Sequence, residues 1–236
     1  MSSQSIQDGS WSGPAVNAPA TNIGSGLAAS ATDGSSIENV FGGDGADTIT
    51  GDDDNNILGD GFGADDLSGG LGDDRYVLEP DVASTDNDDV RETPNPTPGE
   101  TDMDTLDFSR AGHGFTPEQG VTIDMDLLNV PQDVFGGNTV QLNQQAPAPA
   151  PSPFENFIGS RQADVVQIDP LSVVRTVDGN SLVAAGETTP VDTLYFDGGG
   201  SVVTDTGTSL SVGGIGSVLY ANLETVEPYN AAARTI

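Results

Sequence analysis

The chain has 236 residues, and its 37 acidic residues against six basic ones give a formal net charge of −31. Such a charge argues against nucleic acid and anionic membrane surfaces as partners, because both are themselves negatively charged. The absence of Cys excludes a disulfide framework and, with a single His, argues against a zinc site, while no apolar run approaches the roughly 18 residues that a membrane helix needs.

The first 36 residues are rich in Ser, Gly, Ala and Asn, a composition typical of a flexible arm. Two interpretations stay open: a disordered leader, or an arm that becomes ordered by pairing with a neighbouring subunit. The opening residues have neither a basic start nor an apolar core, so we expect no cleavable secretory signal. This fits an uncleaved C-terminal export signal, a trimmed chain, or a protein that stays inside the cell.

Four nonapeptides follow in one register between Gly42 and Val77, and they read GGDGADTIT, GDDDNNILG, DGFGADDLS and GGLGDDRYV. Their sixth residues all carry side-chain oxygens and are Asp47, Asn56, Asp65 and Asp74. Their eighth residues are large and mostly aliphatic, namely Ile49, Leu58, Leu67 and Tyr76. The pattern matches GGxGxDxUx, in which U is a large apolar residue, and this repeat is typical of a parallel β-helix that binds calcium.

Each nonapeptide predicts half of one coil. Glycine tolerates positive φ and lets another backbone come close, so the Gly-rich part can turn tightly and aim its carbonyls inward. The x-U-x part is long enough for a brief strand with one buried side chain. Two nonapeptides therefore make a coil of about 18 residues, which pairs Asp47 with Asp65 on one edge and Asn56 with Asp74 on the other.

The stacked carboxylates of such a coil repel one another, by about 3 kcal/mol per pair at about 5 Å and an effective dielectric near 20. The ten Asp of this segment are accompanied by one basic residue, Arg75, so nothing within the segment neutralises them. Ca²⁺ would neutralise them, because it accepts six to eight carbonyl and carboxylate oxygens. The predicted ligands, through backbone or side-chain oxygens, are Gly42, Asp44, Asp47, Gly51, Asp53, Asn56, Asp60, Asp65, Gly69 and Asp74.

The segment resembles the haemolysin-type, or RTX, calcium-binding repeats of secreted bacterial proteins. The phrases IENVFGGDGADTIT, DTLDFS followed by GVTIDMDL, and DTLYFDGGG followed by YANLETVE resemble stretches around such repeats in large bacterial surface and matrix proteins. The resemblance implies a parallel β-roll with calcium between successive turns, type I secretion, and folding triggered outside the cell. The second nonapeptide departs from the pattern, since Asp54 and Asn56 replace the usual Gly and Asp.

An internal duplication organises the rest of the chain. IENVFGGDGADTI (Ile37 to Ile49) aligns with FENFIGSRQADVV (Phe154 to Val166), and DTLDF (Asp104 to Phe108) aligns with DTLYF (Asp192 to Phe196). The two phrases are farther apart in the first copy, by an excess close to three nonapeptides. We interpret this as one ancestral unit used twice, with extra calcium coils in the first copy; the alternative is chance similarity of short β segments.

Further strands are expected on both sides of a Pro-rich stretch. VTIDMDL (Val121 to Leu127) alternates apolar and acidic residues, as a half-buried strand does, and residues 209 to 227 predict two or three more strands. QQAPAPAPSP (Gln144 to Pro153) favours an extended linker. The predicted divisions are an arm (1–36), a first β unit (37–130) with the nonapeptides (42–77), a linker (131–153), a second β unit (154–229) and a tail (230–236).

The sequence gives no catalytic signature. His113 lies between glycines without a second His, and no GxSxG nucleophile motif is present, so we expect no enzyme. We expect an all-β, β-roll or β-solenoid protein that binds Ca²⁺ outside the cell or at its surface and associates with itself or with cell-surface components, as a matrix, surface-layer, filament or adhesin protein. The alternatives are an export or accessory module of a secreted polysaccharide-acting enzyme, and a halophilic domain with vestigial repeats.

Overall fold

The computed structural model describes residues 28–30, 39–79, 87–93, 102–111, 119–144, 153–180 and 190–235. These residues form an all-β protein with twenty strands, and they contain no helix. Accordingly, no helix in the described ranges is long and apolar enough to cross a membrane. Most of the predicted arm, the loop that carries His113 and the core of the Pro-rich stretch lie outside the described residues.

The strands form three sheets, listed here in spatial order. The six-stranded sheet contains β1 (Ala28–Ser30), β3 (Thr48–Thr50), β5 (Asp66–Ser68), β7 (Asn87–Glu92), β11 (Asn138–Gln144) and β10 (Gln132–Phe135). The ten-stranded sheet contains β2 (Asn39–Phe41), β4 (Ile57–Gly59), β6 (Arg75–Val77), β8 (Asp104–Asp107), β12 (Phe154–Ile158), β14 (Val174–Asp178), β18 (Gly216–Ala221), β17 (Ser209–Val212), β16 (Val202–Asp205) and β20 (Ala233–Thr235). The four-stranded sheet contains β19 (Thr225–Tyr229), β15 (Thr193–Asp197), β13 (Val165–Ile168) and β9 (Thr122–Asp124).

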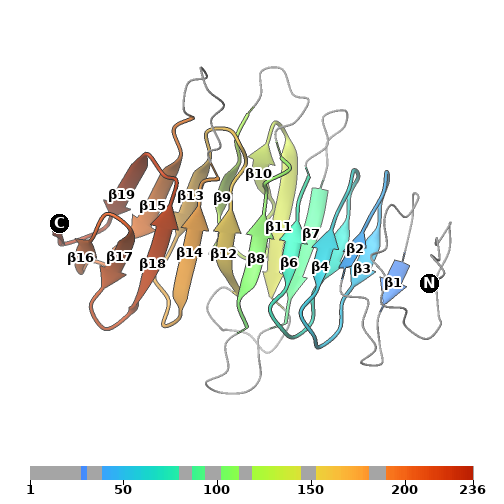
Figure 1. Ribbon diagram of the computed structural model, residues 1–236, viewed down its shortest axis with the longest axis horizontal. Helices are drawn as coiled ribbons and strands as arrows, with labels where there is room; N and C mark the ends of the chain where they lie inside the picture. Colours follow the sequence, from blue (N-terminus) through green and yellow to red (C-terminus); the bar gives the residue numbers. More distant parts are fainter. Residues whose placement is uncertain are drawn as a thin grey trace.

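From β2 to β8 the chain alternates between the ten-stranded and the six-stranded sheet. Ile49 pairs with Leu67 across β3 and β5, and Leu58 pairs with Tyr76 across β4 and β6, in parallel registers. The hydrogen bonds between equivalent bends span 18 residues, so the predicted coil length is confirmed. Figure 1 shows the consequence, since within each sheet the strands up to β8 follow one another along the long axis in chain order.

The core lies between the sheets and is built from the predicted eighth positions. Ile49 and Leu67 come from the six-stranded sheet, Leu58 and Tyr76 from the ten-stranded one, and all four are fully buried in one cluster. Burial of each such side chain contributes about 1.5 to 3 kcal/mol. A strand of three residues can place only one side chain inward, so each of these strands contributes a single side chain to the core.

Beyond the nonapeptides the coils become longer and less regular. The bond from Asp65 to the next equivalent bend residue spans 23 residues, and the bond from Asp74 spans 30. The four-stranded sheet meets the six-stranded sheet where β9 contacts β10 and where Leu128 bridges to Leu142. All strand pairs among the described residues are parallel except β10 with β11, and β17 with β16 and β18.

The sheets cross the predicted divisions of the chain. Strands β10 and β11 fall within 131–153, which the sequence analysis interpreted as a linker, and β11 pairs with β7 over six residues. Strand β8 of the first predicted unit pairs with β12 of the second. Within the predicted tail, β20 pairs with β16, and within the predicted arm, β1 pairs with β3. Both strands precede the Pro-rich residues 145–153, most of which lie outside the described residues.

The expected later strands are present. Val121, Ile123 and Met125 are buried while Thr122 is exposed, as the alternation in VTIDMDL predicted. Residues 209–227 contain β17, β18 and the start of β19. The two DTL phrases begin β8 and β15, which belong to different sheets. Four strands (β4 to β7) lie between β3 and β8 in the first copy and one (β14) lies between β13 and β15 in the second, which matches the excess of three half-coils.

Candidate metal centre

The sixth residue of each nonapeptide stands directly before a strand, and a hydrogen bond joins it to the sixth residue one coil away. The backbone N–H of Asp47 donates to Asp65 Oδ1 at 2.6 Å, and that of Asn56 donates to Asp74 Oδ1 at 2.7 Å. All four residues are at most 2% exposed. The predicted pairing of these residues on two edges is therefore confirmed, and each carboxylate faces an N–H group of the neighbouring coil.

This ladder of acids continues past the repeats. Asp65 N–H donates to Asp88 Oδ1 at 3.0 Å, Asp74 N–H donates to Asp104 Oδ1 at 2.9 Å, and Asp104 N–H donates to Glu155 Oε2 at 3.0 Å. The later coils repeat the arrangement with Val121, Asp164, Asp192 and Glu224, where each N–H donates to the next carboxylate. Acids at or next to the start of a strand thus form a ladder that extends well beyond the nonapeptides.

The same side chains also close their own bends. Asp47 Oδ2 accepts the N–H of Gly43 at 2.8 Å, and Asp164 Oδ2 accepts the N–H of Ser160 at 2.7 Å. The two residues were aligned in the predicted duplication, and the structure gives them the same bond to the residue four positions earlier. Hydrogen bonding therefore accounts for part of the preference for Asp at this position, because a carboxylate accepts several N–H groups at once.

Oxygens of successive coils converge beside the first glycine of a bend. A Cβ built on Gly42 would lie less than 3.0 Å from Asp47 Oδ2 and from the carbonyl oxygen of Asp60. A Cβ on Gly51 would be equally close to Asn56 Oδ1 and to the carbonyl oxygen of Gly69. These glycines are therefore required for space. The space beside them is lined by a carbonyl and a side-chain oxygen, which are ligands that calcium accepts.

The predicted ligands divide into a buried and an exposed set. Asp44 and Asp53 are exposed in the bends, whereas the other eight predicted residues are buried. Asp60 takes the first position of the third nonapeptide, where glycine is usual, and its carboxylate accepts the N–H groups of Gly61 and Glu79. Burial, and then the nearby Asp88, raise the pKa of Asp60 well above its ordinary value.

A second group of acids lies at the end of the repeat segment. One oxygen each of Asp74, Glu92 and Asp104 lies within 4.8 Å of the others, and all three residues are at most 2% exposed. Asp74 Oδ2 has no hydrogen-bond partner among the described residues. We refer to Asp74, Glu92 and Asp104 as the acid triad. Three carboxylates so close together could hold a metal ion.

Glu92 replaces a bend glycine in the triad. Ser68 pairs with Arg91, so Glu92 stands beside Gly69, where the coils before it have glycine. The hydroxyl of Tyr76 accepts the N–H of Gly69 at 2.7 Å and donates to Glu92 Oε2. A Cβ built on Gly69 would lie less than 3.0 Å from both Asp74 Oδ2 and the Tyr76 hydroxyl. Both oxygens therefore crowd the space beside Gly69, next to Glu92.

The triad carries a high electrostatic cost in the absence of a cation. Burial raises the pKa of Glu92 to about 9 and that of Asp74 to about 7. Burial and the charge of Glu92 raise the pKa of Asp104 to about 10. Carboxylates so placed either hold protons or share a cation, because neighbouring negative charges in a poorly solvated site cannot all persist.

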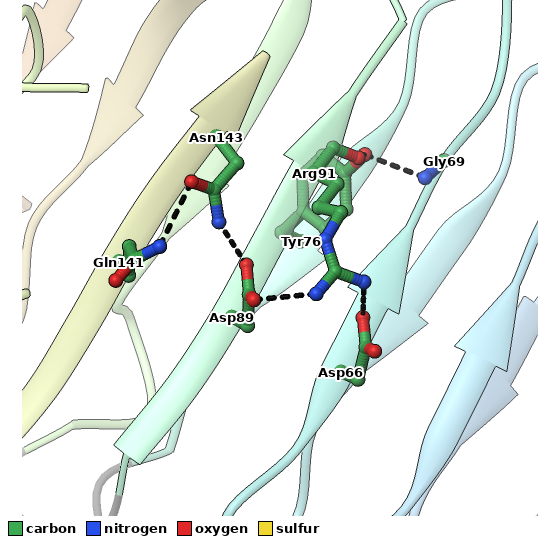
Figure 2. A network of polar contacts seen from close by, with 7 residues as sticks. All are labelled: Asp66, Gly69, Tyr76, Asp89, Arg91, Gln141 and Asn143. Atoms are coloured by element: carbon green, nitrogen blue, oxygen red, sulfur yellow. Dashed lines mark hydrogen bonds and ion pairs between the residues drawn. The ribbon is translucent and has the colours of Figure 1, made fainter. Parts of the chain in front are cut away.

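Part of the surface charge is balanced by arginine from outside the repeat segment. Arg91 pairs with Asp89 of its own strand, β7, and with Asp66 of the neighbouring strand, β5. Asn143 of β11 extends this network by a hydrogen bond to Asp89 (Figure 2). Arg75 pairs with Asp107 at 2.6 Å. Asp66 of the repeats therefore has a basic partner from outside the repeat segment, while the described chain has no ion pair to the acid triad.

Glu92 and Asp104 were not among the predicted ligands. A signal for Asp104 was present, because each ladder acid except Glu224 is followed two residues later by a large buried residue, as in Asp47-Thr-Ile49 and Asp104-Thr-Leu106. Glu92 gives no such signal, since its position depends on how β7 pairs with β5.

Comparison with known proteins adds no relative: no family model, no curated protein and no solved structure matches the chain.

Proposed function

We propose that this chain is an extracellular calcium-binding structural protein whose RTX-like nonapeptides form a parallel β-roll around Ca²⁺. The observation that carries the proposal is the convergence of a side-chain oxygen and a carbonyl oxygen of the next coil beside Gly42 and Gly51. The parallel coils place this arrangement once on each edge of the nonapeptides. Ca²⁺ accepts such mixed oxygen ligands, whereas the chain has no Cys and one His for softer metals.

The bound cation would offset the charge of the buried ladder acids. The residues that would hold it are the bend glycines and Asp60 through their carbonyls, and Asp47, Asn56, Asp65 and Asp74 through their side chains. Asp44 and Asp53 are exposed, so they would add charge around the bends. Because extracellular calcium modules bind with dissociation constants of roughly 10⁻⁴ to 10⁻³ M, such bends would fill outside the cell and not in the cytosol.

We also propose that the protein assembles with copies of itself through the open ends of its sheets. Strand β2 pairs only with β4, and β19 pairs only with β15, so each leaves one edge without a partner strand in the described chain. Unpaired edges favour addition of a strand from another chain. Pro228 removes one N–H donor from β19, so β2 offers the more complete edge.

A calcium titration followed by circular dichroism tests the metal and the coupled folding together. We expect β structure to increase with Ca²⁺ and to be lost when a chelator is added, while Mg²⁺ at the same concentration has less effect. Asp47→Asn should weaken the response, because it removes one negative charge. The substitution keeps an acceptor oxygen for the hydrogen bond of the bend. Asp133→Asn, at an exposed site on β10, is the matched control. An unchanged spectrum across the titration contradicts the proposal.

Electron microscopy tests the assembly separately. Filaments or sheets at millimolar Ca²⁺, absent after chelation, are expected. If the protein forms only single particles at that concentration, the proposal of self-assembly is contradicted. The proposal of a calcium-dependent fold is not affected by that result.

A further inference from the structure

We infer that the acid triad, Asp74, Glu92 and Asp104, is a metal site of its own that holds one hard divalent cation. Two of its three residues lie outside the nonapeptides, and it uses carboxylates where the bends use glycine carbonyls. The inference shares Asp74 with the proposed function of the repeats, and it is tested separately through Glu92 and Asp104, which lie outside the nonapeptides. It concerns one enclosed site at the junction between the regular coils and the longer ones.

The convergence of three separate chain segments argues for a built site. Asp74 precedes β6, Glu92 ends β7, and Asp104 begins β8, and the registers of these strands bring one oxygen of each within 4.8 Å of the others. Asp74 Oδ2 is buried, lacks a hydrogen-bond partner in the described chain, and shares the space beside Gly69 with the Tyr76 hydroxyl. An unpartnered buried carboxylate oxygen costs free energy unless a cation or a proton meets it.

The hydrogen bonds around the triad hold its members in place and leave ligand positions open. Asp104 Oδ1 accepts the N–H of Asp74, Asp74 Oδ1 accepts the N–H of Asn56, and Glu92 Oε1 accepts the N–H of Thr93. The Tyr76 hydroxyl donates to the other oxygen of Glu92 and accepts the N–H of Gly69, which holds it in place. Oriented carboxylates of this kind are the usual support of a cation site.

The ligand chemistry selects the class of cation. The triad offers carboxylate oxygens with a phenol nearby, and no nitrogen or sulfur ligand is within the group. Oxygen-only sites suit Ca²⁺, Mg²⁺ and Mn²⁺ and not the softer transition metals. No arginine of the described chain pairs with the triad, since Arg75 and Arg91 are engaged with Asp107, Asp66 and Asp89.

Tyr76 makes the site observable with terbium. Tb³⁺ replaces Ca²⁺ in oxygen sites and emits when a nearby tyrosine is excited, and the Tyr76 hydroxyl bonds directly to Glu92. The measurement uses the full chain with Trp11→Phe, which removes the single Trp. We expect tyrosine-sensitised emission that Ca²⁺ displaces. Tyr76→Phe should lose the emission while calorimetry still detects the bound cation.

The ligand variants are isosteric, so the ladder keeps its acceptors. Glu92→Gln and Asp104→Asn should each weaken binding of Ca²⁺ at this site roughly 10- to 100-fold and abolish the Tyr76-dependent emission. Glu224→Gln is the matched control, because Glu224 accepts the N–H of Asp192 in the same kind of ladder at the other edge. Circular dichroism of each variant reports whether the fold is retained.

The outcomes separate this inference from the proposed function. If Glu92→Gln and Asp104→Asn keep the wild-type stoichiometry and emission, the triad holds no cation and the inference is overturned, while calcium-dependent folding through the repeats is unaffected. If calcium does not alter the fold but the Tyr76-dependent emission is present, the inference stands and the proposed function fails. Emission that Tyr76→Phe leaves undiminished comes from the other three tyrosines, locates the cation elsewhere and also overturns the inference.

Discussion

Glu155 and Arg175 stand at matching positions of the adjacent strands β12 and β14, where Asn156 pairs with Thr176. Asp74, Asp104 and Glu155 follow one another along this edge, and the next position in the register is a fully buried arginine. The acid ladder therefore ends against a positive charge. Burial raises the pKa of Glu155 to about 8, and the charge of Arg175 acts in the opposite direction.

Arg175 also ties together three segments, and its replacement by Met should be among the most damaging single changes. Its Nη1 bonds to Asp126 at 2.8 Å and to the carbonyl of Asp169 at 3.0 Å, and its Nη2 bonds to the carbonyl of Phe154 at 2.6 Å. Arg175→Met removes these donors and leaves Asp126 unpaired, so we expect a loss of about 3 to 5 kcal/mol in the free energy of unfolding.

Denaturant unfolding in chelator measures this effect without a contribution from bound cations. Arg161→Met, at an exposed position that makes no ion pair within the described residues, is the control and should change stability by about 0.5 kcal/mol or less. A loss at Arg175 no larger than that of the control would mean that the buried guanidinium does not stabilise this edge.

Gly51→Ala tests whether the bend glycines are needed for space. The added methyl would lie less than 3.0 Å from Asn56 Oδ1 and the carbonyl oxygen of Gly69, so we expect a loss of about 1 to 3 kcal/mol and weaker calcium binding. Gly213→Ala is the control, since a Cβ there meets nothing within 4 Å. Equal melting temperatures for the two variants would contradict the close approach of the coils at Gly51.

The stability of the cation-free protein should depend on pH through Asp164. Burial raises the pKa of Asp164 from 3.8 to about 7, so between these values the folded state binds a proton that the unfolded state releases. The stabilisation is complete below about pH 4 and is lost as the pH rises through about 7, with a slope of about 1.4 kcal/mol per pH unit for one group.

Asp164→Asn removes this titration and keeps an oxygen for the N–H of Val121 or Ser160. Between about pH 4 and pH 7 the unfolding free energy of the variant should fall less steeply than that of the wild-type protein, as measured by denaturant titrations in chelator. Any further effect of the substitution on the unfolding free energy should be the same at every pH. Parallel pH curves for the variant and the wild-type protein would show that Asp164 does not titrate in this window.

The regular part of the fold could be predicted because its period is strict. Ile49, Leu58, Leu67 and Tyr76 recur every nine residues, which fixes both the strand positions and the pairing of bends 18 residues apart. A single register of this kind determines which side chains are buried and which neighbours they meet. Sequence alone was sufficient here because the loops between the strands have constant length.

The acid triad and Arg175 could not be predicted, because they depend on coils of unequal length. Glu92 meets Asp74 only through the pairing of β7 with β5, and Asp104 meets it across a span of 30 residues. Arg175 reaches the ladder because β14 pairs with β12. Insertions between strands leave the register of the sheet intact but remove the fixed spacing along the sequence. The contacts of these residues are therefore visible only in the three-dimensional structure.

Unfolding of the wild-type protein in calcium and in chelator tests the central claim most directly. At a free concentration 100 times the dissociation constant, each occupied site should add about 2.7 kcal/mol to the free energy of unfolding, so the melting temperature should rise clearly with Ca²⁺. Identical unfolding curves in millimolar Ca²⁺ and in chelator would mean that the oxygen-lined bends are held by hydrogen bonds alone, and would contradict the account.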